Sequence, residues 1–369
     1  MFALIKLLKK REYMKIAIVN SNLILNSEEL TREKRYKFNF GNRLCSSGLQ
    51  NIVNENLELI NEISQTQIEK FDLFILNLQD HLRPEVAGFL DENVFLLPPD
   101  KTLVTSVGIN AFNGTIEKKK NDKLIDFLKK CSVYSKIGCR GEHTKMYLNL
   151  RGIENTIITG CPSIFNNFQE NYNLSNKLLT AGGEGLSQSL KKDLINPYQI
   201  YLSYILQGDY DLNISNNIEL DGAVLKKLNN GFILYEKNKT FFSNLSIIKL
   251  ENKMIVNNCI RPFENTIDLS NYISEFAGFV GSRIHSSILS LLNGVPAINL
   301  NFDLRAIELC GTLNIPNGYM LNVNSKKEYL DFFEENRNIL INQFLKKRQQ
   351  LFEIYFKSYS KYLNLKDLN

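Results

Sequence analysis

The residues best suited to chemistry lie in one segment, FAGFVGSRIHSS at positions 276–287. An apolar run ends at Val280, the glycine after it predicts a turn, and a helix is expected to begin near Arg283. The first turn of a helix offers unpaired N–H groups and the positive end of the helix dipole, so it suits an anion. Arg283 adds a planar guanidinium that matches a carboxylate or a phosphate. His285 stands within reach of the same anion, and histidine gives and takes protons near neutral pH.

Each of these residues also has a purely structural interpretation. Ser282 can be no more than a helix cap, Arg283 one half of a surface ion pair, and His285 a core histidine. Ser286 and Ser287 add hydroxyl donors near the same turn. An arginine and a histidine together at a strand-to-helix junction favour a functional site over these alternatives.

The first half of the chain repeats this arrangement in residues 137–144, IGCRGEHT. A short strand leads to Arg140, and the helix that follows starts with small and polar residues. Two arginines at two such junctions, one in each half, would hold a small anion of charge two or three from both sides. Cys139 and Cys161 lie beside these turns, but a cysteine nucleophile needs a placed base. Buried free thiols are the simpler interpretation.

Apolar runs and helical patterns alternate through the first half, which predicts a parallel, doubly wound sheet. A polar stretch at 166–196, rich in Asn, Ser and Gly, is interpreted as a linker. Its Gly-Gly-Glu-Gly at 182–185 is taken as a crossover rather than a phosphate loop. The strands expected in this half are 15–19, 71–78, 103–107 and 156–159, and the helices are 43–53, 122–134 and 141–150.

The pattern then restarts, so the fold class expected is α/β, with two Rossmann-like lobes facing a cleft in a GT-B-like arrangement. The predicted lobes are 14–170 and 190–325, and a long helix at 326–357 braces them. Ligands in open α/β sheets bind beyond the carboxyl ends of the strands. The second half is expected to hold strands at 199–206, 232–235, 245–250, 276–280 and 296–300, and helices at 221–228, 284–292, 303–313 and from 325.

Composition limits the partners. The 369 residues carry a net charge of +5, which fits an anionic ligand or membrane surface but is too weak to argue for nucleic acid. The six cysteines form no CxxC pair and the three histidines no HExxH, so no metal site is predicted. No apolar run is long enough to span a membrane.

The N-terminal segment MFALIKLLKKREYMK, residues 1–15, mixes apolar and basic residues. The charges follow the apolar residues, which is the wrong order for a secretory signal, so a cytoplasmic location is expected. The segment is interpreted either as an amphipathic contact with the inner face of the cytoplasmic membrane or as a plain extension before the first strand.

Three blocks of the sequence resemble the polysaccharide pyruvyl transferase family. The block GSRIHSSILSLLNGVPAINLNFDLRAIELCGTLNIP looks like the family's most specific signature, with Arg-x-His, a helix and Gly-x-Pro. The blocks CRGEHTKMYLNLRGIENTIITGCPSIF and NFGNRLCSSGLQNIV are similar to its middle and N-terminal elements. The chain departs from the family at Gly41-Asn42, where Gly-Asp is usual, and at Asn77 to His81, where a glycine-rich turn is usual.

The resemblance implies transfer of the pyruvyl group of phosphoenolpyruvate onto two hydroxyls of a sugar, in a cell-surface polysaccharide or its lipid-linked precursor, with release of phosphate. His285 is then the expected acid, and no cofactor or metal is implied. The alternatives are a GT-B glycosyltransferase that uses a nucleotide sugar and a non-catalytic glycan- or anion-binding protein. The residues implied to bind phosphoenolpyruvate are Arg283, Arg140, Ser282, Ser286 and Ile284, and those on the acceptor side are Asn42, Asp80 and His81.

Overall fold

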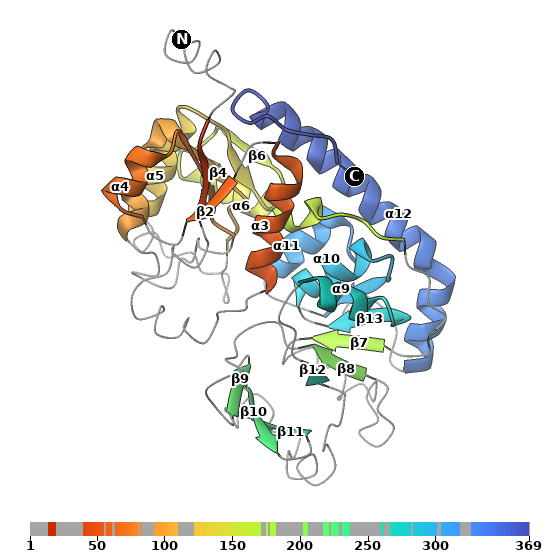
Figure 1. Cartoon of the computed structure of the whole chain (residues 1–369). Helices are drawn as coiled ribbons and strands as arrows, with labels where there is room; N and C mark the ends of the chain where they lie inside the picture. Colours follow the sequence, from red (N-terminus) through yellow and green to blue (C-terminus); the bar gives the residue numbers. More distant parts are fainter. Residues whose placement is uncertain are drawn as a thin grey trace. The chain divides into compact units, whose positions relative to one another are not determined.

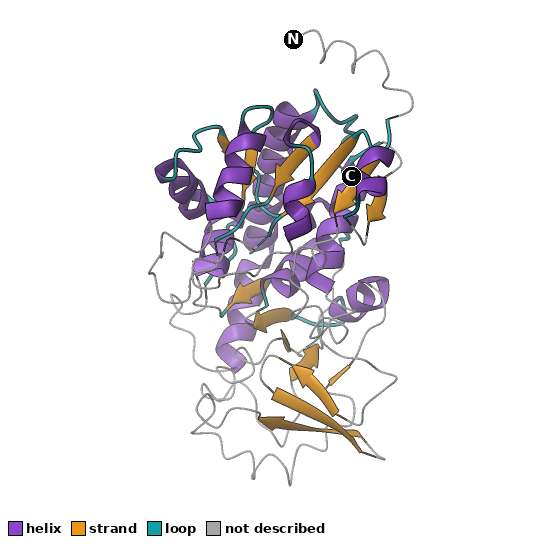
Figure 2. Ribbon diagram, turned by 90° about the vertical axis from the view of Figure 1, so that its left-hand side faces the viewer, coloured by secondary structure: helices purple, strands orange, loops and turns teal. Residues whose placement is uncertain are grey.

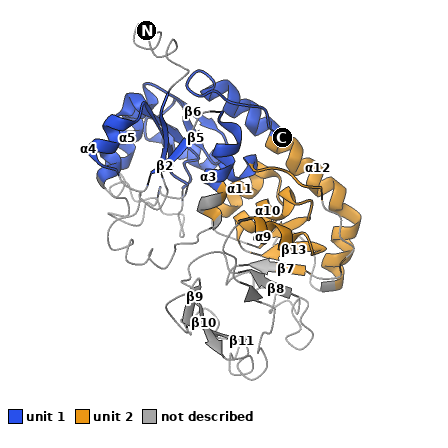
Figure 3. Cartoon of the chain, viewed as in Figure 1, with its two compact units in different colours: residues 1–30, 45–165, 349–369 blue, residues 31–44, 166–348 orange. Residues whose placement is uncertain are grey.

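The structure is a computed structural model, and the chain divides into two compact units (Figure 3). Unit 1 comprises residues 1–30, 45–165 and 349–369, and unit 2 comprises residues 31–44 and 166–348. The residues that the structure describes are 14–19, 40–54, 57–60, 63–79, 82, 92–109, 122–170, 175, 178–181, 202–205, 217–220, 223–228, 231–236, 260–261, 266–281, 283–300, 304–317 and 326–368.

The main sheet of unit 1 is parallel and has the strand order β2-β1-β3-β4. A second parallel pair, β5 and β6, adjoins it through a bridge between Val107 and Cys139. Every residue of β1, β3 and β4 is buried, as expected for strands of a parallel sheet that is covered on both faces. The strands are β1 (Ile16–Val19), β2 (Leu57–Ile60), β3 (Leu73–Asn77), β4 (Thr102–Thr105), β5 (Ile137–Cys139) and β6 (Thr156–Ile158).

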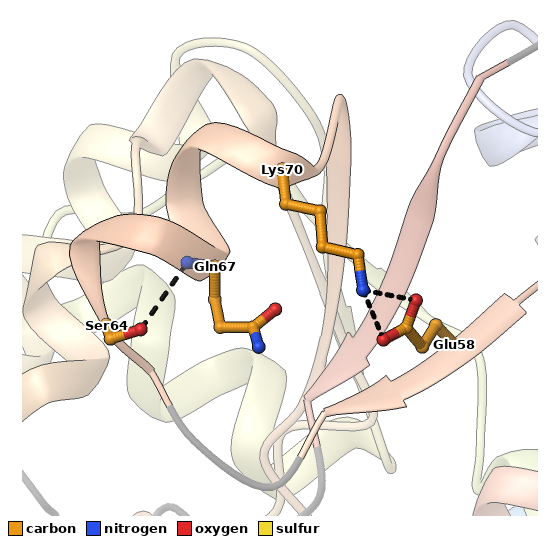
Figure 4. Close-up of polar contacts among 4 residues, drawn as sticks. All are labelled: Glu58, Ser64, Gln67 and Lys70. Atoms are coloured by element: carbon orange, nitrogen blue, oxygen red, sulfur yellow. Dashed lines mark hydrogen bonds and ion pairs between the residues drawn. The ribbon is translucent and has the colours of Figure 1, made fainter.

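Helices cover the strands of unit 1, with α4 and α5 on one side and α3 on the other (Figures 1 and 2). The first turn of α4 is capped by Ser64, whose Oγ accepts a hydrogen bond from the Gln67 backbone N–H at 3.4 Å (Figure 4). At its other end, Lys70 Nζ lies 2.6 and 2.8 Å from the two carboxylate oxygens of Glu58 on β2. The helical elements are α3 (Phe40–Ile52), α4 (Gln65–Lys70), α5 (Asp122–Ser132), α6 (Glu142–Leu150) and the 3₁₀ turns η3 (Glu92–Leu96), η4 (Pro99–Lys101) and η5 (Pro162–Phe165).

Unit 2 holds a five-stranded sheet of order β12-β8-β7-β13-β14, in which every neighbouring pair is parallel. A separate antiparallel sheet has the order β11-β10-β9. The strands are β7 (Leu178–Ala181), β8 (Leu202–Ile205), β9 (Asn217–Leu220), β10 (Ala223–Leu228), β11 (Gly231–Glu236), β12 (Ile260–Arg261), β13 (Gly278–Gly281) and β14 (Ala297–Asn299), and the helices are α9 (Thr266–Ile273), α10 (Ile284–Leu292) and α11 (Leu304–Leu313).

The last helix, α12 (Lys326–Tyr359), belongs to both units, because residues 326–348 lie in unit 2 and residues 349–359 in unit 1. In unit 2, Arg337 Nη2 donates a hydrogen bond to the Gly294 carbonyl at 2.5 Å. In unit 1, the ring of Tyr355 meets that of Phe165 edge to face at 5.3 Å between centroids. Tyr359 is fully buried, and its hydroxyl donates to the Lys136 carbonyl at 3.1 Å.

The α/β class predicted from the sequence is confirmed, and most elements lie within a few residues of their predicted bounds. Two interpretations were wrong. Residues 221–228 form no helix, because β10 pairs with β11 across two asparagines, a residue type that favours tight turns. The supposed linker at 166–196 contains β7, the central strand of the unit 2 sheet, whose short LLTA sequence gave little signal. The expected strand at 245–250 lies outside the described residues, and the lobe boundaries stay predictions.

Among the described residues, no helix combines the length and the apolar character needed to cross a bilayer.

Candidate active site

The turn between β13 and α10 places Arg283 at the N-cap of the helix. Its backbone is extended, with φ −87° and ψ 105°, and its carbonyl accepts the first helical hydrogen bonds, from the backbone N–H groups of Ser286 at 3.0 Å and Ser287 at 3.1 Å. The helix therefore begins at Ile284, as the sequence predicted. The first turn of α10 has no acidic residue that would compete with an anion at its positive end.

Burial separates the residues of this turn into two groups. Arg283 and His285 are half-buried, so their side chains are the accessible ones. Ile284 is 6% exposed, and Ser286 and Ser287 are fully buried. The Ser286 hydroxyl has no hydrogen-bond partner among the described residues. Contact between Ser286 and a ligand would therefore require this first turn to open.

The imidazole of His285 lies against the first turn of helix α3, whose residues 40–44 belong to unit 2. A Cβ atom placed on Gly41 would stand 2.5 Å from Nδ1, 3.0 Å from Cε1 and 3.1 Å from Cγ of His285. Real Cβ atoms do not approach other heavy atoms this closely, so only glycine fits at position 41 without movement of the ring. The glycine of the Gly41-Asn42 pair thus has a steric explanation.

A buried polar chain supports the turn from β14. Asn299 Nδ2 donates to Ser287 Oγ at 3.2 Å, and Ser287 Oγ lies 3.5 Å from the Arg283 carbonyl. The Leu300 backbone N–H donates to the Gly281 carbonyl at 2.8 Å. Asn299 was missed by the sequence reasoning. The available signal was an amide side chain at the end of an apolar strand.

The strand order gives this turn a special place. In the unit 2 sheet, β7 is the first strand in the chain, β8 and β12 lie on one side of it, and β13 and β14 on the other. The chain therefore adds strands in opposite directions on the two sides of the boundary between β7 and β13. In open α/β sheets, ligands bind at such a boundary, beyond the carboxyl ends of the strands. Arg283 and His285 directly follow the carboxyl end of β13.

In unit 1, Arg140 follows the carboxyl end of β5, as predicted, but its side chain is buried, with 1% exposure. Its Nε donates to Ser106 Oγ at 3.2 Å and its Nη2 to Cys161 Sγ at 3.7 Å. The guanidinium of Arg140 is held by these buried partners and is far less accessible than that of Arg283.

Two thiols lie beside Arg140. Cys45 Sγ is 3.3 Å from Cys161 Sγ, and Ser163 Oγ lies 3.2 Å from Cys161 Sγ. Burial raises the pKa of the Cys45 thiol well above its usual range, and Cys161 adds to this rise, whereas Arg140 and Asn77 oppose it. Cys45 therefore stays protonated, which makes it a poor nucleophile. Cys139 is also buried, and its Sγ donates to the Ile137 carbonyl at 3.8 Å.

The strand ends beside Arg140 hold strained backbone. Gln79, after β3, has φ 39°, and Ser106, after β4, has φ 55°, in the left-handed region that non-glycine residues rarely occupy. A Cβ atom on Gly108 would lie 2.3 Å from the Gln79 carbonyl oxygen and 2.7 Å from Arg140 Cδ. Strain of this kind is often found at functional sites. The sequence reasoning did not single out Ser106 or Gly108.

The remaining predicted residues are less informative. Asn42 lies in α3, and its side chain is outside the described part of the structure. Ser282, Asp80 and His81 are also outside the described residues, as are Gly182 to Gly185.

The model of the polysaccharide pyruvyl transferase family matches residues 5–303. The chain belongs to this family. Members of the polysaccharide pyruvyl transferase family are transferases, so the enzyme class predicted from the sequence is confirmed. The matched residues include Arg140, Arg283 and His285 and the parallel sheets of both units.

Solved structures give weaker likenesses. UDP-GlcNAc 2-epimerase from Neisseria meningitidis, bound to UDP-GlcNAc, is 12% identical with a TM-score of 0.43, over 93% of this chain and 100% of that one. A putative UDP-N-acetylglucosamine 2-epimerase from Listeria monocytogenes is 10% identical with a TM-score of 0.43, over 96% and 98%. A structure of accessory secretory protein 1, 2 and 3 in Streptococcus pneumoniae is 11% identical with a TM-score of 0.41, and the match covers 80% of this chain but only 55% of that one. No curated protein matches the sequence.

Proposed function

We propose that the protein transfers the pyruvyl group of phosphoenolpyruvate onto two hydroxyls of one sugar in a cell-surface polysaccharide or its lipid-linked precursor. The observation that carries the proposal is the pairing of half-buried Arg283 and His285 at the carboxyl end of β13, in a chain of the pyruvyl transferase family. Both phosphoenolpyruvate groups, a carboxylate and a phosphate, are anions that a guanidinium and a helix N-terminus bind.

The reaction needs one proton at the methylene carbon of phosphoenolpyruvate. Its addition converts the neighbouring carbon into an oxocarbenium-like centre, which one sugar hydroxyl attacks. The second hydroxyl replaces the phosphate on the same carbon, and the products are a cyclic ketal and inorganic phosphate. His285 is the residue we assign to proton delivery, because imidazole changes its charge near neutral pH.

Arg283 is assigned to the donor anion, and Arg140, at the carboxyl end of β5, is proposed as a second anion-binding residue. Ile284, Ser282 and Ser286 are kept as supporting residues of the donor turn, and Asn42, Asp80 and His81 as proposed acceptor-side residues.

The amphipathic N-terminal segment is proposed to help the protein reach a lipid-linked acceptor at the inner face of the cytoplasmic membrane. Deletion of residues 2–11 should leave activity on a soluble acceptor intact and reduce activity on acceptor in anionic vesicles. Equal losses on both acceptors would contradict this part of the proposal.

The test of the function is incubation with phosphoenolpyruvate and a panel of glycans, with detection of free phosphate and of a mass gain equal to pyruvate less water. His285→Ala should lower turnover by roughly 10²–10⁴-fold, the usual share of general acid catalysis. His143→Ala, a matched change at an exposed histidine on α6, should leave it unchanged. Nucleotide release from a sugar nucleotide, without phosphate release from phosphoenolpyruvate, would instead indicate a glycosyltransferase. A His285→Ala protein that is folded and keeps normal turnover would refute the assigned acid.

A further inference from the structure

The packing of His285 against helix α3 fixes the orientation of its imidazole. The three ring atoms nearest to a Cβ at position 41 are Nδ1, Cε1 and Cγ, which together form one edge of the imidazole. Nε2 and Cδ2 make up the opposite edge. The Nδ1 edge therefore rests on the first turn of α3, and Nε2 points away from it.

We propose that Gly41 is a positioning residue for His285: its missing side chain lets the Nδ1 edge of the imidazole rest on α3 and so holds the ring in the orientation in which it delivers the proton. This inference deepens the proposed function and rests on it. Gly41 touches no reacting atom, so its effect passes through the imidazole alone.

The need for glycine at position 41 comes from the closeness of the His285 ring and not from the backbone conformation. Gly41 lies within helix α3 and is not among the residues with positive φ. Alanine is favoured over glycine in a helix, so Gly41→Ala should stabilise the protein unless the new methyl group meets something. Here it would meet His285 Nδ1 at 2.5 Å, and the ring would have to move.

Gly311, in α11 of the same unit, provides the matched control. It also lies inside a helix, but a Cβ added there would have no atom within 4 Å. Gly311→Ala therefore makes the same chemical change without the contact. Any effect seen only in Gly41→Ala comes from the neighbourhood of the imidazole.

The closing experiment follows the histidine rings by nuclear magnetic resonance, which needs no catalytic turnover. The chain has only three histidines, so the ring signals can be assigned by the loss of one set in His285→Gln. Gly41→Ala should shift the ring ¹³C and ¹⁵N signals of His285 and leave those of His143 in place. Gly311→Ala should shift none. Unmoved His285 signals in Gly41→Ala would overturn the proposal.

Turnover provides the second readout. Gly41→Ala should lower kcat by about 10²-fold, the scale reported for small misplacements of a catalytic group, while the KM for phosphoenolpyruvate changes far less. In a His285→Ala background the same change should cost no further turnover, because the ring it displaces is already gone. Multiplied losses in the double variant would show that Gly41 does not act through His285.

A folding defect in Gly41→Ala leaves the inference testable. Removing the imidazole removes the atom that the new methyl group would meet, so Gly41→Ala/His285→Ala should fold and should be at least as stable as His285→Ala. A double variant that stays unfolded would overturn the proposal. If Gly41→Ala shifts the ring signals of His285 but the unchanged protein transfers no pyruvyl group, the positioning role of Gly41 stands and the proposed function is refuted.

Discussion

Arg283 lies at the end of strand β13 and at the N-terminus of helix α10, and its side chain is half-buried. Its contribution to anion binding should therefore depend on the shape of the guanidinium as well as on its charge. Arg283→Lys keeps the charge but loses the planar fork that contacts an anion through two N–H groups. We expect phosphoenolpyruvate to bind more weakly by about 1–3 kcal/mol, the scale of a charged hydrogen bond. Calorimetric titration with phosphoenolpyruvate measures this.

Arg151→Lys gives the control for the Arg283 prediction. Arg151 lies in unit 1 and pairs with the Asp122 carboxylate at 2.5 Å, away from the predicted donor turn in sequence. It should leave phosphoenolpyruvate affinity unchanged. Equal affinities in all three proteins would remove Arg283 from the donor site.

The buried thiol of Cys131 should make the free energy of unfolding depend on pH in the alkaline range. Burial raises the pKa of its thiol from 9.0 to about 12. Below pH 9 the thiol is protonated in both states, so it has no effect on the pH dependence. Between pH 9 and 12 the unfolded chain loses this proton and the folded chain keeps it, so the free energy of unfolding should fall by about 1.4 kcal/mol per pH unit.

Urea unfolding at about pH 8 and about pH 10.5 checks this slope. Cys131→Ala should be less stable at about pH 8 because a cavity forms, but its stability should fall less steeply with pH. Part of the slope should remain, because burial also raises the pKa of the Tyr355 and Tyr359 hydroxyls. Parallel lines for the two proteins would contradict the assignment to Cys131.

At the scale of elements, β13 and α12 approach each other very closely. A Cβ atom on Gly278 would lie 2.2 and 2.3 Å from two ring carbons of Phe333. Gly278→Ala should therefore destabilise the protein by about 1–3 kcal/mol, the usual cost of overpacking a core. Thermal and urea unfolding measure the change.

Two variants sharpen the Gly278 prediction. Phe333→Leu should make room for the methyl group, so its combination with Gly278→Ala should cost less than the sum of the single changes. Gly311→Ala should be neutral or stabilising by up to about 1 kcal/mol, because no atom lies near its new Cβ. Additive costs at positions 278 and 333 would show that the two residues do not compete for space.

Elements with strong local patterns were predictable, and those defined by distant partners were not. The apolar run before Arg283 and the amphipathic pattern of α5 carried enough local signal to place both within a few residues. The strand β10 was mistaken for a helix because only its pairing with β11 distinguishes the two. Asn299 was signalled only by an amide side chain at the end of an apolar strand, and the role of Gly41 could not be inferred, since each residue matters through a neighbour in another element.

For the whole molecule, the C-terminal residues complete unit 1. Phe352 and Tyr355 both contact the ring of Phe165, and the Lys366 backbone N–H donates to the Ile52 carbonyl at 2.9 Å. Loss of one large buried aromatic side chain costs about 3–5 kcal/mol, and a whole domain is stable by only about 5–15 kcal/mol. A chain that ends after Arg348 should therefore have an unfolded unit 1.

Hydrogen exchange reads out this truncation segment by segment. Backbone amides of β1, β3 and β4 should lose their protection. Phe356→Ala, a change at a more exposed position of the same helix, should leave that protection largely in place. Persistent protection of these strands in the truncated chain would show that unit 1 folds without its C-terminal segment.

The division of α12 between the units also governs the order of events during synthesis. Residues 45–165 of unit 1 are synthesised before residues 166–348 of unit 2, and residues 349–369 of unit 1 follow both. The strands of unit 1 therefore leave the exit tunnel before the aromatic residues of α12 that pack on this unit. Domains normally fold as they emerge, N-terminal first. In this chain residues 45–165 cannot contact residues 349–369 until residues 166–348 have been made, so we expect unit 1 to finish folding only after most of unit 2 has been synthesised.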